Sequence, residues 1–449
     1  MTDMTADRAP ARKGSLLTAD ARTRRRNAAE KRFRLYGLIA IGIGLAALIV
    51  LLTSVVSKGV PAFYQTYLRA SIYLDPAVLD PSGQRDPEQI AKILTFSYAP
   101  LIKASLTDTA EKLAAEGNAG ITANLMAGMV SGAANAELRN YVIAHPDQIG
   151  QTVEFDFLAN GRIDQYLKGH ITLESAERDS RVSPAQLKAA DVMVADGVMD
   201  TRFNWAFLTN PDASENRPEA AGLGVALLGS AYMMLIVLGL ALPVGVAASI
   251  YLEEFAPKNR FTDIIEVNIS NLAAVPSIVF GILGLAIFIN FMHLPNSAPI
   301  VGGLVLTLMT LPTIIISTRA ALKSVPPSVR DAALGVGASR MQAIFHHVLP
   351  LAMPGILTGT IIGLAQALGE TAPLLLIGMV AFVREYPGGL PGGLFDPATG
   401  LPVQIYNFTQ RADPAFVERA SGAIIVLLVF LVAMNLIAIV LRRRFERRW

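Results

Sequence analysis

The sequence lacks cysteine, which excludes disulfides, thiolate zinc sites and iron–sulfur clusters. Charge is scarce as well: Asp, Glu, Lys and Arg make up 16% of the 449 residues, against about 25% in ordinary soluble domains. The only neighbouring histidines, His346 and His347, cannot share a helix face, so we expect no metal site. No lysine follows a glycine, and the phosphate-cradling motif G-x-x-x-x-G-K-[ST] is therefore missing. We expect no catalytic residue, no bound cofactor and no nucleic-acid partner.

Charge is absent altogether from five long stretches. They are Leu35–Ser57, Ala220–Leu252, Val267–Thr318, Met341–Gly369 and Ala420–Leu441. A bilayer core needs about 20 apolar helical residues, so each stretch can hold one span and the longest can hold two. The sequence therefore predicts an all-α integral membrane protein with six transmembrane helices. We place them at 35–57 and near 221–250, 266–292, 298–322, 350–380 and 418–441.

Basic residues predict the orientation of these spans. Residues 1–34 carry ten Lys or Arg against four acids, and the chain ends in RRRFERRW. By the positive-inside rule both basic tails, 1–34 and 442–449, are cytoplasmic, in keeping with an even number of spans. They are expected to contact anionic lipid headgroups. The first apolar run is longer than a signal-peptide core and no A-x-A pattern follows it, so 35–57 is interpreted as an uncleaved span.

The segment 58–219 is predicted to form an extracytoplasmic insert domain between the first and second spans. It contains 14 basic and 21 acidic residues, a balance that suits translocated chain. The stretches TDTAEKLAAEG, NAELRNYVIAHP and SPAQLKAADVMVADG have helical spacing with cap residues, while VEFDF alternates like a short strand. We expect a mostly helical insert, followed by a core at 220–441 that holds five spans.

The loop between the fourth and fifth spans reads SVPPSVRDAALGVGASRMQAIFHHVLP. Its paired prolines forbid continuation of the upstream helix, and Ser328 with Asp331 resembles a capping box that starts a new one. The glycines of GVG break that helix, and a second helical segment, 338–347, is expected to stop at Pro350. The residues alone leave two interpretations equal: a docking site for another protein, or a helix lying on lipid headgroups.

The same loop resembles the EAA loop of ABC-importer permeases. The residues at the offsets of that pattern are Asp331, Ala332, Ala333, Gly337, Leu349 and Pro350. Two positions depart from it, because Asp331 replaces glutamate and His347 replaces isoleucine. The resemblance implies that this loop docks onto a separate ATPase.

Two further segments, NLAAVPSIVFGILGL at 271–285 and ALGETAPLLLIG at 367–378, resemble the PstA-type permeases of phosphate importers. The resemblance covers 220–441, and the insert resembles extensions found in some members. It implies a bacterial inner-membrane subunit that carries phosphate together with a PstC-type second permease. It also implies a PstB-type ATPase dimer, which uses ATP and Mg, and a periplasmic PstS-type phosphate-binding protein.

Glu370 lies inside the fifth apolar stretch, where a carboxylate costs about 2.5 kcal/mol or more. We interpret it as part of a substrate pathway; the alternative is a structural partner for Arg319. A phosphate that retains a proton can donate to a carboxylate, which would repel sulfate. Gln366, four residues earlier, stands where the family often has arginine. The expected pathway residues are Glu370, Arg319, Gln366, Thr371, Ser277 and Asn271.

Three other functions remain open on the sequence. The cargo could be another oxyanion such as sulfate or molybdate, because only the resemblance indicates phosphate. The chain could instead be a self-sufficient secondary transporter, although such proteins commonly show internal repeats and none is evident here. A third possibility is a membrane-anchored receptor whose external segment binds a ligand.

Overall fold

The computed structural model describes residues 21–81, 83–118, 120–379 and 382–445, and the chain forms two compact units, Met1–Val56 and Ser57–Trp449. The described part of the first unit belongs to α1 (Ala21–Gly59), a helix of 39 residues. Parts of both predicted basic tails, 1–20 and 446–449, lie outside the described residues.

Among the described residues, five helices are long and apolar enough to cross a membrane. Including the turns that extend them, they cover Arg22–Phe63, Gly224–Phe255, Pro299–Ser324, Arg340–Gly369 and Ala415–Arg444. A sixth span exists if a pair of helices, Arg260–Leu272 and Ser277–Phe291, is counted as one broken span. The all-α membrane architecture is therefore confirmed, with one span built differently from the others.

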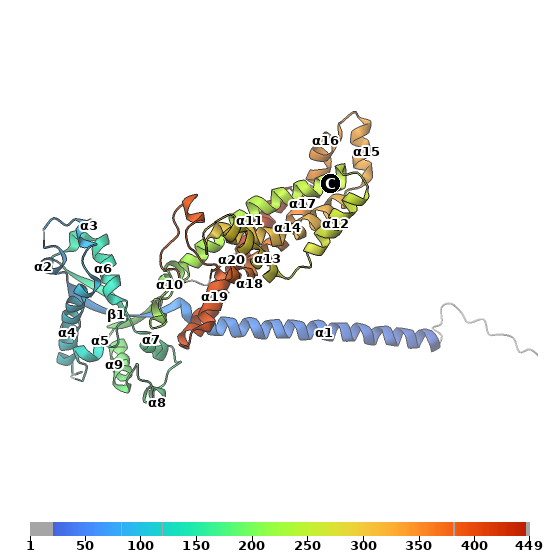
Figure 1. Cartoon of the computed structure of the whole chain (residues 1–449). Helices are drawn as coiled ribbons and strands as arrows, with labels where there is room; N and C mark the ends of the chain where they lie inside the picture. The colour runs from blue at the N-terminus through green and yellow to red at the C-terminus, as the bar shows by residue number, and fades with distance from the viewer. Residues whose placement is uncertain (1–20, 82, 119, 380–381, 446–449) are drawn as a thin grey trace, which may run out of the picture. The chain divides into compact units, whose positions relative to one another are not determined.

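The helices of the second unit's core follow one another as α11 (Gly224–Ile250), α12 (Arg260–Leu272), α13 (Ser277–Gly284), α14 (Pro299–Ser324), α15 (Pro327–Gly335), α16 (Arg340–Ala343), α17 (Leu349–Gly369), α18 (Ala372–Leu376), α19 (Leu401–Gln410) and α20 (Ala415–Phe445). The α15 and α16 helices form a hairpin at the end of α11 that is far from the insert (Figure 1). Between α18 and α20, α19 is an additional helix that no predicted span covers; its 10 residues are too few to span a bilayer.

The span predicted near 266–292 is present only as a pair of helices with a sharp bend between them. Its two halves, α12 and α13, meet at an angle of 103°. Pro276 occupies the N-cap position of α13 with an extended backbone. A proline lacks the N–H that a continuous helix would use and pushes the preceding residue out of the helical region, so the chain turns at this point.

Two local predictions in the loop before α17 are wrong. Pro350 does not stop a helix, because the wider π turn Ile344–Val348 joins α16 to α17 and accommodates the proline in the next turn. The predicted span near 350–380 therefore overlaps a helix that begins earlier, at Arg340, and ends at Gly369, before the separate helix α18. Ser328 does not cap α15; Pro326 holds the N-cap position and Pro327 starts the helix with its fixed φ.

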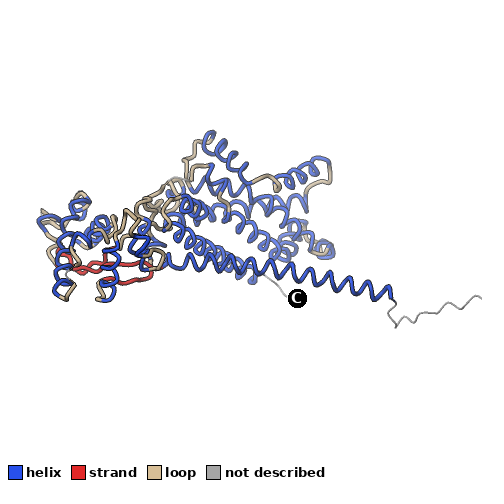
Figure 2. Tube along the Cα trace, turned by 90° about the horizontal axis from the view of Figure 1, so that it is seen from below, coloured by secondary structure: helices blue, strands red, loops and turns tan. Residues whose placement is uncertain are grey.

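The insert packs helices around a small sheet (Figure 2). Its strands β1 (Tyr64–Tyr73), β2 (Thr152–Leu158) and β3 (Met199–Phe203) are antiparallel in the order β2-β1-β3. Its helices are α2 (Pro76–Leu79), α3 (Pro87–Ile90), α4 (Ala99–Ala115), α5 (Ala123–Ala127), α6 (Ala134–Ala144), α7 (Gly161–Leu167), α8 (Leu173–Ala176), α9 (Pro184–Ala195) and α10 (Trp205–Thr209). The three predicted helical stretches are confirmed as α4, α6 and α9, and VEFDF is confirmed within β2.

Buried ion pairs join the insert to the core. Lys168 follows α7, and its Nζ lies 2.7 Å from Asp164 Oδ2 and 2.8 Å from Glu418 Oε1 on α20. All three side chains are less than 10% exposed. Because charges buried in this way are stable only as a set, they hold the insert against the start of α20.

Candidate functional site

Two short helices, α13 and α18, pack side by side in the core. A Cβ placed on Gly281 would lie 2.7 Å from Pro373 Cα, and one on Gly284 would lie 3.5 Å from the Ile377 side chain. Position 281 meets residue 373 and position 284 meets residue 377, so the residue numbers increase in the same direction and the two helices run parallel. The breaks that precede them, before Ser277 and after Gly369, therefore lie at the same end of the pair. Glycine at 281 is what allows the two backbones to approach so closely.

Three of the predicted pathway residues lie at these breaks. Ser277 is the first residue of α13, and Glu370 with Thr371 forms the link between α17 and α18. All three are half-buried. Within the described part of the chain, the Glu370 carboxylate has no hydrogen-bond or ion-pair partner. The N-terminal end of α13 carries a partial positive charge, so the breaks combine donor groups with a free carboxylate.

The other predicted pathway residues lie elsewhere. Asn271 is exposed on α12, on the far side of the bend, and Gln366 is exposed on α17. Helical spacing does not place Gln366 beside Glu370, because α17 ends at Gly369 and Glu370 has an extended backbone. The expectation that two residues four positions apart share a helix face therefore does not hold for Gln366 and Glu370.

Arg319 does not pair with Glu370. Its guanidinium contacts Glu266 Oε1 at 2.6 Å and Glu253 Oε2 at 3.4 Å. Gly359 packs against Ser317, close to Arg319 in α14, and the part of α17 from Gly359 to Gly369 spans about 15 Å before Glu370 is reached. The structure thus keeps this arginine among carboxylates at the hairpin end of the bundle, away from the helix breaks.

A second arginine, Arg330, fixes the position of α15. Its guanidinium donates to Glu254 at 2.6 and 3.1 Å, to the Leu322 carbonyl at 3.0 Å and to the Val325 carbonyl at 2.9 Å. The two carbonyls belong to the end of α14 and the residue after it, where backbone acceptors lack helical partners. Arg330 therefore ties the hairpin to α14 and to the turn that ends α11.

The α15/α16 hairpin, residues 326–348, presents most of the predicted docking residues to solvent. Asp331, Ala332 and Gly337 are exposed, whereas Ala333 is buried and packs inward. Gly337 has φ +90°, a left-handed conformation that glycine adopts without strain. Ser339 then caps α16 through a capping box with Gln342. The predicted turn at Gly337 is confirmed, while Gly335 is the last residue of α15.

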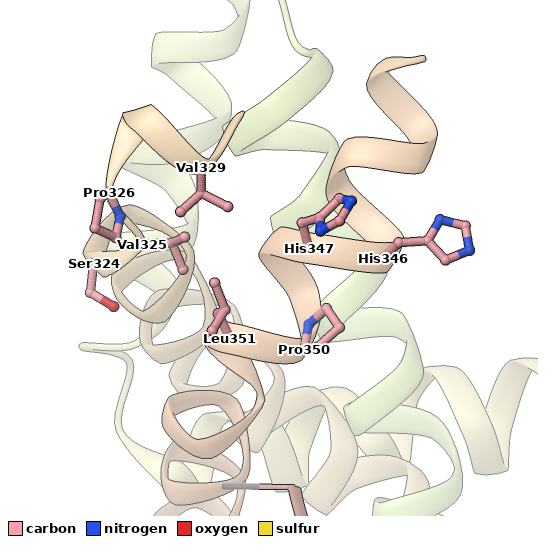
Figure 3. A pocket seen from close by; sticks show the side chains of 8 residues that line it. All are labelled: Ser324, Val325, Pro326, Val329, His346, His347, Pro350 and Leu351. Atoms are coloured by element: carbon pink, nitrogen blue, oxygen red, sulfur yellow. The ribbon is translucent and has the colours of Figure 1, made fainter. Parts of the chain in front are cut away.

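The remaining docking residues, Leu349 and Pro350, lie deeper. A pocket of about 520 Å³ opens between the ends of α14 and α17, with Val325, Val329 and Leu351 facing His347 and Pro350 (Figure 3). Leu349 lines a neighbouring groove of about 400 Å³ that also contains Met341 and Phe345. Val336, at the tip of the hairpin, is 87% exposed. The hairpin thus combines an apolar surface with a rigid turn.

Sequence reasoning missed Arg330, Glu253 and Glu254. The signal available was the pair of acids directly after the second apolar stretch and the arginine beside Asp331. Which acid meets which arginine depends on helix packing and is not visible in the pattern. No group of three or more His, Asp or Glu able to hold a metal occurs among the residues described.

Comparison with known proteins shows matches for both parts of the chain. Residues 241–449 match the family described as binding-protein-dependent transport system inner membrane component, and residues 20–177 match a domain of unknown function, DUF3333. A probable ABC transporter permease protein, YqgI of Bacillus subtilis, is 34% identical over 49% of this chain and 78% of its own length. Phosphate transport system permease protein PstA 2 of Mycobacterium bovis is 32% identical over 55% of this chain and 79% of its own.

A solved structure shows a weaker likeness. The MetNI methionine ABC transporter in an inward-facing conformation is 17% identical, with a TM-score of 0.38, over 50% of this chain and 95% of the other. A similarity of this size supports no further statement about the present chain.

Proposed function

Because the chain belongs to the PstA-type family of ABC-importer permeases, we propose that it carries inorganic phosphate across the membrane. It is a multi-pass inner-membrane permease subunit and is not itself the catalytic component of its transporter. The phosphate assignment is supported by the relative from Mycobacterium bovis, which is named a phosphate transport system permease. The alternative cargo is another oxyanion, sulfate or molybdate.

The observation that carries the proposal is the unpaired carboxylate of Glu370 at the meeting point of two broken helices. Irregular backbone inside a membrane is tolerated where it is buried in protein or lines a cavity. Phosphate at neutral pH retains a proton that Glu370 can accept as a hydrogen bond, whereas sulfate offers none and would leave the carboxylate unpaired and repelled. Ser277 and Thr371 supply hydroxyl donors at the same level. Gln366 and Asn271 would be reached only if the pathway extends to the exposed faces of α17 and α12.

The α15/α16 hairpin supports the second half of the proposal, a partnership with an ATPase. The hairpin exposes Val336 at its tip and Met341 and Phe345 nearer its base, and Arg330 ties its base to α14 and α11. Movement of a docked ATPase would therefore be passed to two spans at once. In this proposal the partners are a PstB-type ATPase dimer, a PstC-type second permease and a PstS-type receptor. ATP and Mg act on the ATPase, and both termini of the present chain face the cytoplasm.

Radiolabelled phosphate uptake tests the cargo and the role of Glu370. The chain is co-expressed with its ATPase, second permease and receptor, and Glu370→Gln is compared with Glu385→Gln, an exposed carboxylate outside the spans. We expect Glu370→Gln to lose most phosphate uptake, because the acceptor charge is gone, and Glu385→Gln to transport like the parent.

Three results would contradict this expectation. Unchanged uptake and anion selectivity in Glu370→Gln would remove this residue from the pathway. Faster transport of sulfate or molybdate than of phosphate would change the cargo. Uptake by the purified chain alone, driven by an ion gradient, would make it a secondary transporter.

Cross-linking tests the docking role. Because the chain has no cysteine, Val336→Cys gives a single reactive site, and Leu94→Cys in the insert is a matched control with 61% exposure. With a short thiol-to-amine reagent in assembled membranes, we expect Val336→Cys alone to link to the ATPase. A link from Leu94→Cys instead, or none from Val336→Cys in an active complex, would show that the hairpin is not the docking site.

A further inference from the structure

Four aromatic rings of the insert form a continuous cluster where β1 and β3 meet the core. The aromatic cluster consists of Phe63, Tyr64, Phe203 and Trp205. The Phe203 ring centroid lies 4.7 Å from that of Trp205, 6.3 Å from that of Tyr64 and 6.2 Å from that of Phe63. Tyr64 and Phe203 are direct partners in the antiparallel pair β1/β3. These contacts hold the rings as one unit rather than as separate mobile side chains.

The aromatic cluster adjoins the ends of two membrane spans. Phe63 packs edge-on against Phe207 at 5.6 Å, and a Cβ on Gly422 of α20 would lie 3.0 Å from the Phe207 ring. The Leu223 amide, immediately before α11, donates to the Phe207 carbonyl at 2.8 Å. The rings therefore lie beside the residue that precedes α11 and the second turn of α20, near the ends of these two spans.

The outer side of the cluster is open. Trp205 is 67% exposed, Tyr64 is 47% exposed and Phe203 is 42% exposed. The flanking segments, residues 59–68 and 203–211, contain no Asp, Glu, Lys or Arg. Charge begins at Arg202, which directly precedes Phe203 in β3 and forms ion pairs with Asp156 and Asp200, as Arg69 does. Because side chains alternate along a strand, these charged side chains lie on the opposite face of the sheet from Tyr64 and Phe203.

We propose that the aromatic cluster sits among the lipid headgroups on the insert side of the membrane and anchors the insert to the bilayer surface. Trp and Tyr are enriched at membrane–water interfaces because their rings have an apolar body and a polar tip. The position of the rings at the span ends, their exposure and the uncharged segments on either side of them match this preference. The proposal concerns the insert alone and does not depend on which anion is transported.

Trp205 is itself the probe. The sequence contains two tryptophans, so Trp449→Phe leaves Trp205 as the sole emitter in the full-length chain. The protein is reconstituted into phosphatidylcholine vesicles brominated either near the headgroup end or near the methyl end of the acyl chains. We expect bromine near the headgroup to remove most of the Trp205 emission, bromine near the methyl end to remove little, and aqueous acrylamide to quench weakly.

The control moves the ring to the other end of the same strand. Tyr73→Trp, made with Trp205→Phe and Trp449→Phe, places the sole tryptophan at a position that is 53% exposed and nine residues along β1, about 30 Å away. It should be quenched by acrylamide and not by brominated lipid. Trp205 emission quenched by acrylamide as strongly as the control overturns the proposal. Emission that neither acrylamide nor brominated lipid quenches would also overturn it, because a protein partner would then cover the ring. Quenching mainly by bromine near the methyl end would overturn it as well.

Discussion

At the scale of single residues, Arg330 determines where the α15/α16 hairpin sits. Its guanidinium neutralises Glu254 and also satisfies carbonyls at the end of α14. Lysine could supply the charge but not the planar set of donors that reaches three acceptors at once. A neighbouring set, Arg319 with Glu253 and Glu266, joins α14 to α11 and α12. At this end of the core, charged side chains thus act together with a buried apolar cluster that includes Ile250, Leu322 and Val348.

In the insert, Glu137 is a residue whose protonation affects stability. Burial, with a smaller contribution from the nearby Glu219 carboxylate, raises its pKa to about 7, and a backbone hydrogen bond with Leu158 and the charge of Arg217 oppose this rise. In the unfolded chain the ordinary value is 4.5. The folded insert thus binds this proton more tightly, so its stability is fully present below about pH 4.5 and falls as the pH rises to about 7.

We predict that the insert loses on the order of 3 kcal/mol between these two pH values. Denaturant unfolding followed by near-ultraviolet circular dichroism measures the loss. Glu137→Gln, which stays neutral, should flatten this part of the pH profile and be the more stable protein at pH 8. An unchanged slope in that variant would assign the pH dependence to another group.

At the scale of elements, the contact between α13 and α18 joins the two helix breaks. We predict that Gly281→Leu abolishes phosphate uptake while the partner subunits still co-purify with the chain. The new side chain would meet Pro373 Cα and its carbonyl oxygen at 2.7 and 2.9 Å. Backbone atoms cannot yield as a flexible side chain does, so the two helices must separate at a cost of about 1–3 kcal/mol.

Gly239→Leu in α11 is the matched control, because no atom lies within 4 Å of the position its Cβ would take. It should transport at the parental rate in the same vesicle assay. If both variants transport normally, close contact of α13 with α18 is not required for transport.

At the scale of the whole second unit, the insert and the core are joined through buried charge. We predict that Lys168→Met loosens this junction and destabilises the protein by about 3–5 kcal/mol, because Asp164 and Glu418 are left as buried like charges. Hydrogen exchange of α7 and of the first turns of α20 should rise together. The measurement is made on the full chain in detergent or lipid.

Arg69→Met provides the comparison. Its partners Asp156 and Asp200 are 37% and 44% exposed, and such surface pairs contribute at most about 1 kcal/mol. Exchange at α7 should be unaffected by this substitution. Equal effects of the two substitutions would mean that the Lys168 set does not hold the insert to α20.

Local patterns in the sequence were enough to locate most of the spans and several helix ends. The charge-free stretches predicted six spans, of which five are single helices long and apolar enough to cross a membrane, since a long apolar run can be accommodated only in a bilayer or a core. The turn at Gly337 and the helix that starts after Ser183 also followed from neighbouring residues. These features depend on interactions within a few positions of the chain, and such interactions can be read from composition and spacing.

The bend at Pro276, the strands β1 and β3, and the partners of Arg319 and Arg330 were decided by the tertiary structure. Arg330 meets Glu254 across 76 positions of sequence, and Gly281 meets Pro373 between different helices. A pattern can show that a proline disfavours a helix or that an arginine needs an acceptor. The packing of the helices decides where the backbone bends and which acceptor an arginine reaches, because it sets the distances between residues that are far apart in the chain.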